Sequence, residues 1–192
     1  MEAVEAVATP IAKYKFTVAQ YMCMGEAGIF PPGERVELIE GEIVKMSPIG
    51  TRHAARVGWL TQTLIILLQR VALVWVQNPV VLDDLSEPQP DILVLKPRPD
   101  FYAESKPKPN DVLLLIEVAE TTLAYDRKVK LPIYARSGVR EVWIVNLAEE
   151  RIETYADPAG GVYKTTASFG RGEEVQSRLV ASLKLGVSEV LG

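Results

Sequence analysis

The sequence predicts a single α/β domain with a mixed sheet flanked by helices. Its 192 residues suffice for one domain with a full core and are rather few for two. Continuous Val, Ile and Leu runs near residues 90–95, 111–118 and 141–147 are typical of strands that are buried on both faces. Segments in which apolar residues recur at helical spacing lie between the runs, which favours helices packed on a sheet.

The first residues are expected to lie outside the packed domain. Residues 1–13 show no clear periodicity, so we expect a flexible arm followed by a domain at residues 14–192. Thr17 fits the N-cap of a short helix that ends near Ala27. Apolar and charged residues alternate over residues 36–46, which predicts a hairpin with one solvent-exposed face.

The longest predicted helix starts at Thr51, its expected N-cap, and ends near Val71. Its apolar residues recur at helical spacing and form one core-facing stripe, made of Val57, Leu60, Leu64, Leu67, Leu68 and Val71. His53 continues this stripe into the first turn, so its side chain is expected to point toward the sheet. There it is either a hydrogen-bonded structural residue, the commoner case for a lone histidine, or a substrate-binding residue.

Two connections next to the central strands have loop compositions. The strand expected over residues 73–82 is interrupted at Asn78 and leads into residues 83–87, whose acids are expected to be solvated. Residues 96–110 contain four prolines and are expected to form a long irregular loop. Because long loops in compact domains are often functional, this loop is the candidate for a flap that shapes the substrate site.

A further helix is expected over residues 124–138. Gly138 follows a last turn that contains an arginine, and such a glycine is a common helix stop. Pro132 lacks an N–H group and crowds the carbonyl of Lys128. We therefore expect a kink there, or a helix that starts late enough to place Pro132 in its first turn.

The C-terminal part is expected to complete the sheet. Residues 151–156 alternate in polarity and are expected to pair with the strand at 141–147, and residues 162–167 form the next strand. Residues 179–185 read as an edge strand, and residues 188–191 as a short terminal helix.

The composition excludes several classes of protein. No segment approaches the span of about 20 apolar residues that crosses a bilayer, so no membrane association is expected. The start lacks the pattern of a signal peptide and the single cysteine, Cys23, excludes a disulfide framework, so we expect a cytoplasmic protein. With one histidine and one cysteine, the chain has few candidates for imidazole or thiolate catalysis. Hydrolysis by carboxylates and a metal is the main enzymatic option.

The charge distribution leaves nucleic acid open as a partner. A formal net charge of −4 argues mildly against binding through bulk electrostatics, but not against a local basic surface. Basic residues crowd the segment from Arg127 and Lys128 to Arg140, and others lie in the loop at 96–110. They either contact phosphates or are ordinary solvated charges.

Two carboxylates mark the candidate catalytic site. Asp91 opens one apolar run and Glu117 closes the next. If these strands pair antiparallel with Leu95 opposite Leu113, Asp91 falls opposite Glu117, with Cβ atoms roughly 4.5–5.5 Å apart. Carboxylates that close repel each other unless a cation or a shared proton neutralises them; a divalent metal is the simplest remedy, and the oxygens suit Mg²⁺ or Mn²⁺. The alternative is that Asp91 caps a strand and Glu117 pairs with an arginine or lysine.

Lys130 is the third candidate. A turn from strand to helix would bring its ammonium back over the strand ends near Glu117. There it could orient an attacking water, lower the pKa of that water, or stabilise negative charge on a pentavalent phosphate. The alternative is a surface ion pair with Asp126 at i, i+4 spacing, worth about 0.3–0.5 kcal/mol.

Several short motifs follow one another in a set order. They are Pro90-Asp91, Glu117-Val118 after a hydrophobic strand, Tyr125-Asp126-Arg127 with Lys130, the run 130–139 and the strand from Glu141. Upstream lie the acidic segment 37–42, Ser47-Pro48 and His53. Over about residues 36–147 this pattern resembles the Uma2 family of restriction endonucleases, which belongs to the PD-(D/E)XK nuclease superfamily.

The resemblance implies a restriction-endonuclease-like fold and an endonuclease that hydrolyses phosphodiester bonds of DNA with Mg²⁺ or Mn²⁺. The residues that it implies for the metal are Asp91, Glu117, the Val118 carbonyl and Glu37. The residues expected to bind the substrate are His53, Arg127 and Lys128.

The catalytic lysine departs from the superfamily pattern. That pattern expects a lysine two residues after the glutamate, where this chain has Ala119. Migration of the lysine to the following helix is similar to what the family shows, so the resemblance implies Lys130 as the catalytic lysine.

Two other functions stay open. The chain could keep the fold as a binding or assembly protein without turnover, which its net acidity and the missing lysine at position 119 favour. It could also hydrolyse a smaller phosphate ester with a metal, for which a narrow pocket would be required. A homodimer would suit an enzyme that cuts both DNA strands, although nothing in the sequence shows one.

Overall fold

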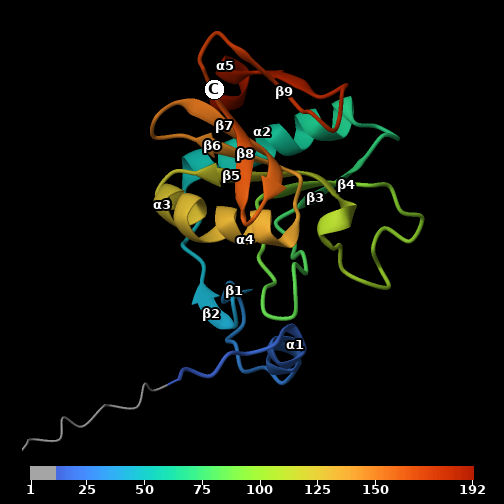
Figure 1. The fold of residues 1–192 in the computed structure, drawn as a ribbon, viewed down its shortest axis with the longest axis vertical. Coiled ribbons are helices and arrows are strands. Elements are labelled where there is room, and N and C mark those ends of the chain that lie inside the picture. Colours follow the sequence, from blue (N-terminus) through green and yellow to red (C-terminus); the bar gives the residue numbers. More distant parts are fainter. Residues whose placement is uncertain (1–11) are drawn as a thin grey trace, which may run out of the picture.

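A mixed six-stranded sheet forms the centre of the computed structural model, which describes residues 12–192 (Figure 1). The strands are neighbours in the order β3-β4-β5-β6-β7-β8, and β5 and β6 are the parallel pair. The predicted mixed sheet is therefore confirmed. The strands are β3 (Leu73–Val76), β4 (Ile92–Leu95), β5 (Val112–Ala119), β6 (Glu141–Asn146), β7 (Arg151–Ala159) and β8 (Val162–Gly170).

Strands β4 and β5 are antiparallel and have the predicted register at the end that carries the two acids. Ile92 faces Ile116, so the residue before Ile92, Asp91, comes opposite Glu117. The backbone N–H of Asp91 donates to Glu117 Oε2 at 3.3 Å, which confirms that the two residues meet.

The predicted register is wrong at the other end of this strand pair. Leu95 faces Val112 instead of Leu113, because the register shifts between Val94 and Leu95. Such an irregularity leaves one extra residue on one strand and bends the pair locally. It lies away from the carboxylates and does not alter their placement.

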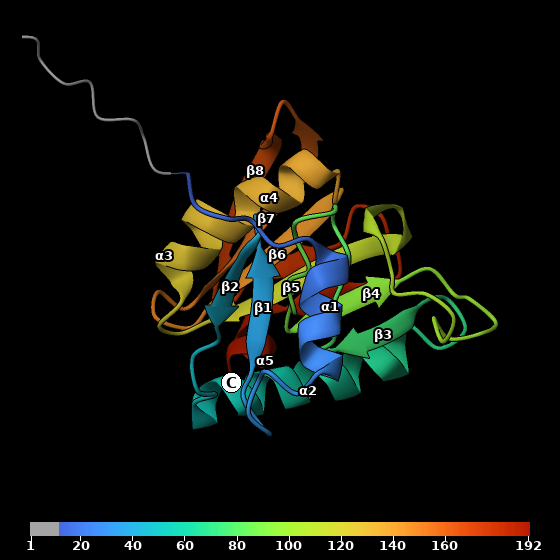
Figure 2. The same ribbon diagram turned by 90° about the horizontal axis from the view of Figure 1, so that it is seen from below.

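Helices cover both faces of the sheet (Figure 2). Helices α2 (Thr51–Leu67) and α5 (Val187–Leu191) lie on one face, and α3 (Leu123–Tyr125) and α4 (Leu131–Ser137) lie on the other. The central strands β4, β5 and β6 are buried on both faces, and their alternate side chains belong to two separate cores. This arrangement explains the continuous apolar runs, since neither face of these strands is wet.

Helix α2 has the predicted core stripe over most of its length. Val57, Leu60, Leu64 and Leu68 are buried. The prediction is wrong for Leu67 and Val71, whose exposed fractions are 40% and 50%. Leu68 takes the inward position one turn after Leu64, and the helix ends before Val71.

The predicted cap of α2 is also displaced by one residue. Gly50 occupies the N-cap with extended backbone angles and no side-chain hydrogen bond, and Thr51 is the first helical residue. His53 nevertheless lies in the first turn, where the sequence places it.

A π-helical turn, Asp126–Lys130, joins α3 to α4. Pro132 lies in the first turn of α4, as predicted, and cannot donate the hydrogen bond that an uninterrupted α-helix would need there. A wider turn just before the proline accommodates this missing donor. Gly138 ends α4 with a left-handed backbone (φ 84°), so the predicted helix stop is confirmed.

The N-terminal elements form a small unit beside the sheet (Figures 1 and 2). Helix α1 (Val18–Glu26) starts at the predicted cap, Thr17, and strands β1 (Val36–Ile39) and β2 (Glu42–Lys45) form the predicted hairpin. The predicted arm at residues 1–13 lies outside the described residues except for its last two positions.

Other connections differ from the predictions. The strand expected over 73–82 ends at Val76, and the edge strand expected at 179–185 is replaced by a small sheet of β9 (Glu174–Gln176) and β10 (Lys184–Gly186). Glu87 is buried rather than solvated, because Lys106 pairs with it at 2.6 Å. In the part of the chain that the structure describes, no helix has the length and apolar character needed to cross a membrane.

Candidate active site

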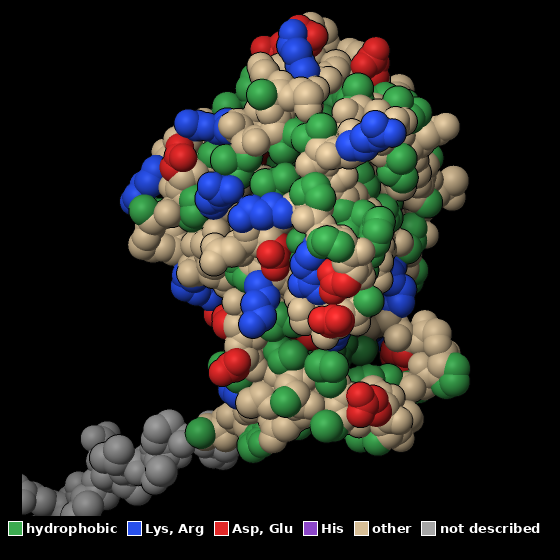
Figure 3. Space-filling model, turned by 90° about the vertical axis from the view of Figure 1, so that its right-hand side faces the viewer, with side chains coloured by type: hydrophobic (Ala, Val, Ile, Leu, Met, Phe, Trp, Pro, Cys, Tyr) green, Lys and Arg blue, Asp and Glu red, His purple; other side chains and the backbone are tan. Residues whose placement is uncertain are grey.

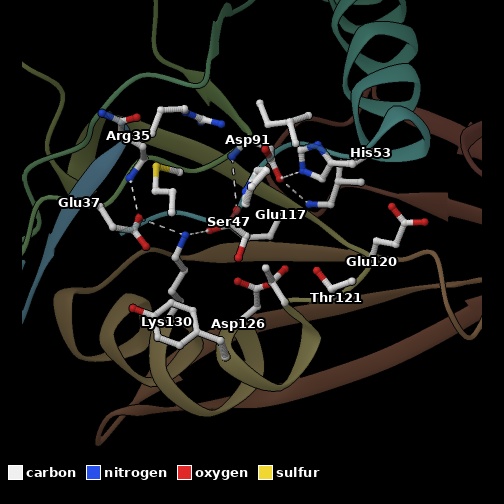
Figure 4. A pocket seen from close by; sticks show the side chains of 18 of the residues that line it. Arg35, Glu37, Ser47, His53, Asp91, Glu117, Glu120, Thr121, Asp126 and Lys130 are labelled. Atoms are coloured by element: carbon white, nitrogen blue, oxygen red, sulfur yellow. Dashed lines mark hydrogen bonds and ion pairs between the residues drawn. The ribbon is translucent and has the colours of Figure 1, made fainter. Parts of the chain in front are cut away.

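The side chains predicted to carry the chemistry meet in a cavity of about 310 Å³ beside β4 and β5 (Figure 4). Its walls come from the β1–β2 hairpin and the loop after it, the first turn of α2, the segment after β5 and the π-helical turn. The predicted residues that line the cavity are Glu37, His53, Asp91, Glu117, Val118 and Lys130. Segments far apart in sequence therefore build one site.

Asp91 is held at the cavity by three groups. Its Oδ2 accepts a hydrogen bond from the backbone N–H of Val118 at 2.9 Å and lies 3.0 Å from His53 Nε2. Its Oδ1 accepts from Gln77 Nε2 at 3.3 Å. The side chain is thus fixed in orientation by backbone and side-chain partners on both sides.

Glu117 is almost fully buried, with an exposed fraction of 4%. Its Oε1 accepts from Tyr134 at 2.6 Å and from Lys130 Nζ at 3.3 Å. Burial raises the pKa of Glu117 to about 8, although the Lys130 ammonium acts in the opposite direction. Without a further cation, this carboxyl group therefore tends to hold a proton near neutral pH.

Lys130 lies over the strand end, as predicted for a catalytic lysine. It is 6% exposed, and its Nζ lies 3.2 Å from Glu37 Oε2 as well as 3.3 Å from Glu117 Oε1. Burial acts to lower the pKa of Lys130, but the surrounding carboxylates, Glu117 foremost, outweigh it and hold that pKa above its ordinary value. The alternative of a solvated surface pair with Asp126 is wrong.

Glu37 is the acid of the hairpin that reaches the site. It is 3% exposed, and Oε2 also accepts from the backbone N–H of Gln89 at 3.2 Å. The other two acids of the hairpin, Glu40 and Glu42, are exposed.

His53 points toward the sheet, as predicted. Its hydrogen bond with Asp91 raises the pKa of His53 above the ordinary value, although burial opposes this. Within the described residues, His53 Nδ1 is buried and has no hydrogen-bond partner. The imidazole therefore makes its one polar contact with the carboxylate of the site.

Two predicted substrate-binding residues are not brought to the cavity. Arg127 Nε donates to Glu153 Oε2 at 2.9 Å, on the side of the helix that faces β7, and Lys128 is exposed. Neither residue lines the cavity, and neither does any residue of the loop at 96–110 that was expected to form a flap. The loop at 46–50 and the segment 120–122 border the site instead.

Several residues of the site were not predicted. Asp126 is buried beside Lys130 and accepts from Thr122 Oγ1 at 2.7 Å, and burial raises its pKa. Tyr134 lies four residues after Lys130, a spacing that places both on one helix face and could have identified it. Arg35 lies two residues before Glu37, so the period of a strand places both on one face.

Carboxylates outnumber cations on the cavity wall. The lining acids are Glu37, Asp91, Glu117, Glu120 and Asp126, and the lining lysines and arginine are Arg35, Lys45 and Lys130. A single divalent cation would balance the difference when all five acids are ionised.

The donor atoms fit a hard divalent cation. Among residues 12–192, no three Asp, Glu, His or Cys side chains converge closely enough to form a metal site by themselves. Mg²⁺ does not require three, because it is usually held by one or two carboxylates together with water and substrate phosphate. Asp91 and Glu117, both lining the cavity, supply two such carboxylates.

Comparison with known proteins gives a family and a fold. The model of the Uma2 family, described as "Putative restriction endonuclease", matches residues 18–188. The chain is also similar to the crystal structure of a "putative nuclease" from Anabaena variabilis, with a TM-score of 0.68 and 18% identity over 92% of this chain and 97% of the other. No curated protein matches the chain. The structural likeness confirms the predicted nuclease-like fold, and the family match, which spans most of the sequence, shows that the chain belongs to the Uma2 family.

Proposed function

We propose that this protein is a Mg²⁺- or Mn²⁺-dependent endonuclease that hydrolyses phosphodiester bonds of DNA. The observation that carries the proposal is the meeting of Asp91, Glu117 and Lys130 in one cavity, from two paired strands and a following helix. Membership of a family described as restriction endonucleases points to the same reaction and to DNA as substrate.

Asp91 and Glu117 are the proposed metal ligands, with the Val118 carbonyl and Glu37 as further candidates. When bound, the metal would supply Lewis acidity for activating a water molecule and for stabilising the leaving oxygen. Because burial raises the pKa of Glu117 to about 8, filling the site near neutral pH requires loss of a proton from that carboxyl group.

Lys130 acts in this proposal as a fixed positive charge. The carboxylates around it hold its pKa above the ordinary value, so the amine does not serve as a base near neutral pH. Glu37 and Glu117 hold the ammonium in place at 3.2 and 3.3 Å, where it can orient the attacking water and stabilise the phosphate in the transition state.

The distribution of surface charge favours recognition of DNA by charges near the site rather than by the net charge of the protein. On the face shown in Figure 3, Lys and Arg side chains are interspersed with Asp, Glu and apolar side chains. With a net charge of −4, attraction must come from charges close to the site.

The size of the cavity supports a second candidate function. A volume of about 310 Å³ lies at the lower end of the range for small-molecule sites, roughly 300–1,000 Å³. A metal-dependent hydrolase of a smaller phosphate ester would fit it. The missing lysine at position 119 no longer favours a binding protein without turnover, because Lys130 supplies an ammonium group at Glu117.

Plasmid cleavage tests the proposal. Supercoiled DNA should be cut by the wild type with Mg²⁺ or Mn²⁺ and left intact with EDTA. Asp91→Asn and Lys130→Met should each lower the rate by about 10²-fold or more, a typical loss for a group that stabilises a transition state. Lys128→Met is the matched control, because this neighbouring lysine is exposed and does not line the cavity.

Cleavage in EDTA, or full activity of folded Asp91→Asn, would contradict the proposal. Hydrolysis of bis(p-nitrophenyl) phosphate without any cleavage of DNA would favour the smaller phosphate ester.

A further inference from the structure

Arg35 is a positively charged residue of the cavity that the sequence did not identify as part of the site. It directly precedes β1, lies two residues before Glu37, and lines the cavity together with it. Figure 4 shows Arg35 on the side where the hairpin borders the site, with Asp126 and Lys130 across from it. The positive charge of Arg35 acts to lower the pKa of His53, which lines the same cavity.

Ion pairing distinguishes Arg35 from Lys45 and Lys130, the other two cations on the cavity wall. Lys45 pairs with Glu34 at 2.6 Å, and Lys130 pairs with Glu37 and Glu117. Within the described part of the chain, Arg35 has no carboxylate oxygen within ion-pair distance. It is partly exposed, so water can reach it. An arginine that lines a cavity with five acids and binds none of them is free to bind an anion.

We propose that Arg35 binds a non-bridging phosphate oxygen of the substrate strand at the reaction centre. A guanidinium offers paired N–H donors in a plane that match two phosphate oxygens, and such charge-assisted bonds are short and strong. The inference rests on the proposed function and adds a substrate contact to it. It also replaces Arg127 and Lys128, which the structure places outside the cavity, as the source of positive charge for the phosphate.

Salt dependence of DNA binding tests this role. Binding of a DNA oligonucleotide would be measured with Ca²⁺ in place of Mg²⁺ over a series of salt concentrations. Arg35→Gln should weaken binding about tenfold and lower the slope of log Kd against log salt by about one, the change expected when one phosphate contact is lost. Arg35→Lys should recover the slope, because it restores the charge, but only part of the affinity.

Arg140→Gln is the matched control, since Arg140 is exposed, lies outside the cavity and has no ion pair among the described residues. It should leave both affinity and slope near those of the wild type. An Arg35→Gln variant whose slope equals that of the wild type would overturn the proposal while leaving the proposed nuclease function intact.

A second measurement decides the case in which the wild type does not bind DNA, which would contradict the proposed function itself. Inorganic phosphate would be titrated into the Mg²⁺-loaded protein while the imidazole resonance of His53, the one histidine of the chain, is followed. A saturable shift that Arg35→Gln abolishes would support a phosphate site for a smaller ester. The same shift in both proteins, or none in either, would overturn the assignment of Arg35.

Discussion

At the scale of single residues, the site depends on charges that are costly to bury. Glu117 is enclosed by Lys130, Tyr134 and the backbone of Asp91, and its surroundings favour the protonated form unless a cation is added. A buried carboxyl group of this kind is expected at a site that binds a cation. When the site is empty, the same group lowers the stability of the folded protein.

The pH dependence of stability should reveal this cost. In metal-free protein the folded-state pKa of Glu117 is about 8, above its unfolded value near 4.5, so the folded state binds the extra proton between these limits. The free energy of unfolding should therefore fall as pH rises from about 5 to about 8. Lys130 is charged in both states over this window and does not reverse the sign.

Glu117→Gln should remove much of this decline, because glutamine keeps the acceptor for Tyr134 and cannot ionise. Urea unfolding in EDTA at pH 5, 7 and 9 would measure it, with a gain for the variant on the order of 1–3 kcal/mol at the highest pH. Glu120→Gln, at the edge of the same cavity, should show no comparable gain. A variant that is less stable than the wild type at all three pH values would show that Glu117 is a structural ion-pair partner.

At the scale of secondary-structure elements, the π-helical turn places Lys130 and is itself tied to the sheet. Arg127 of this turn binds Glu153 of β7, which also accepts from Asn146 at 3.0 Å and from Tyr155 at 2.6 Å. Glu153 and Asn146 are buried, so this network connects the helix to the two strands behind it.

Arg127→Gln should therefore act on stability rather than on substrate binding. Loss of the charged partner leaves the Glu153 carboxylate undercompensated, at a cost of about 1–3 kcal/mol in the free energy of unfolding. Chemical denaturation would measure that cost, and the salt slope of DNA binding should remain that of the wild type. A slope reduced by about one, with stability unchanged, would instead make Arg127 a phosphate contact.

The sequence predicted this element in outline. Pro132 indicated that the helix could not run straight through, and Gly138 marked its end. The π form could not be predicted, because Pro132 indicates only that the helix is interrupted and does not specify how the preceding turn adapts. In this turn Lys130 lies at Glu117, the position that the sequence predicted, whereas Arg127 pairs with Glu153 and Lys128 is exposed, so that neither of these two lines the cavity.

At the scale of the whole molecule, hydrophobic pattern was sufficient for the mixed sheet and its flanking helices. The same pattern was sufficient to predict that Asp91 lies opposite Glu117, because the two apolar runs are consecutive strands and the acids mark the ends at which they pair. The placement of the β1–β2 hairpin against the site is a long-range contact that no local pattern encodes. Arg35 was therefore missed, and the proline-rich loop at 96–110 was wrongly expected to border the site.

The most direct test of the metal site uses the one histidine of the chain as a reporter. His53 Nε2 lies 3.0 Å from Asp91 Oδ2, so a metal that binds Asp91 must change the surroundings of the imidazole. Mg²⁺ would be titrated into metal-free protein while the His53 resonance is recorded by NMR, with Asp91→Asn and the remote Asp100→Asn as paired variants. The proposed site predicts a saturable shift in the wild type and Asp100→Asn that is lost in Asp91→Asn. A His53 resonance that stays unchanged in the wild type throughout the titration would contradict metal binding by Asp91 and Glu117.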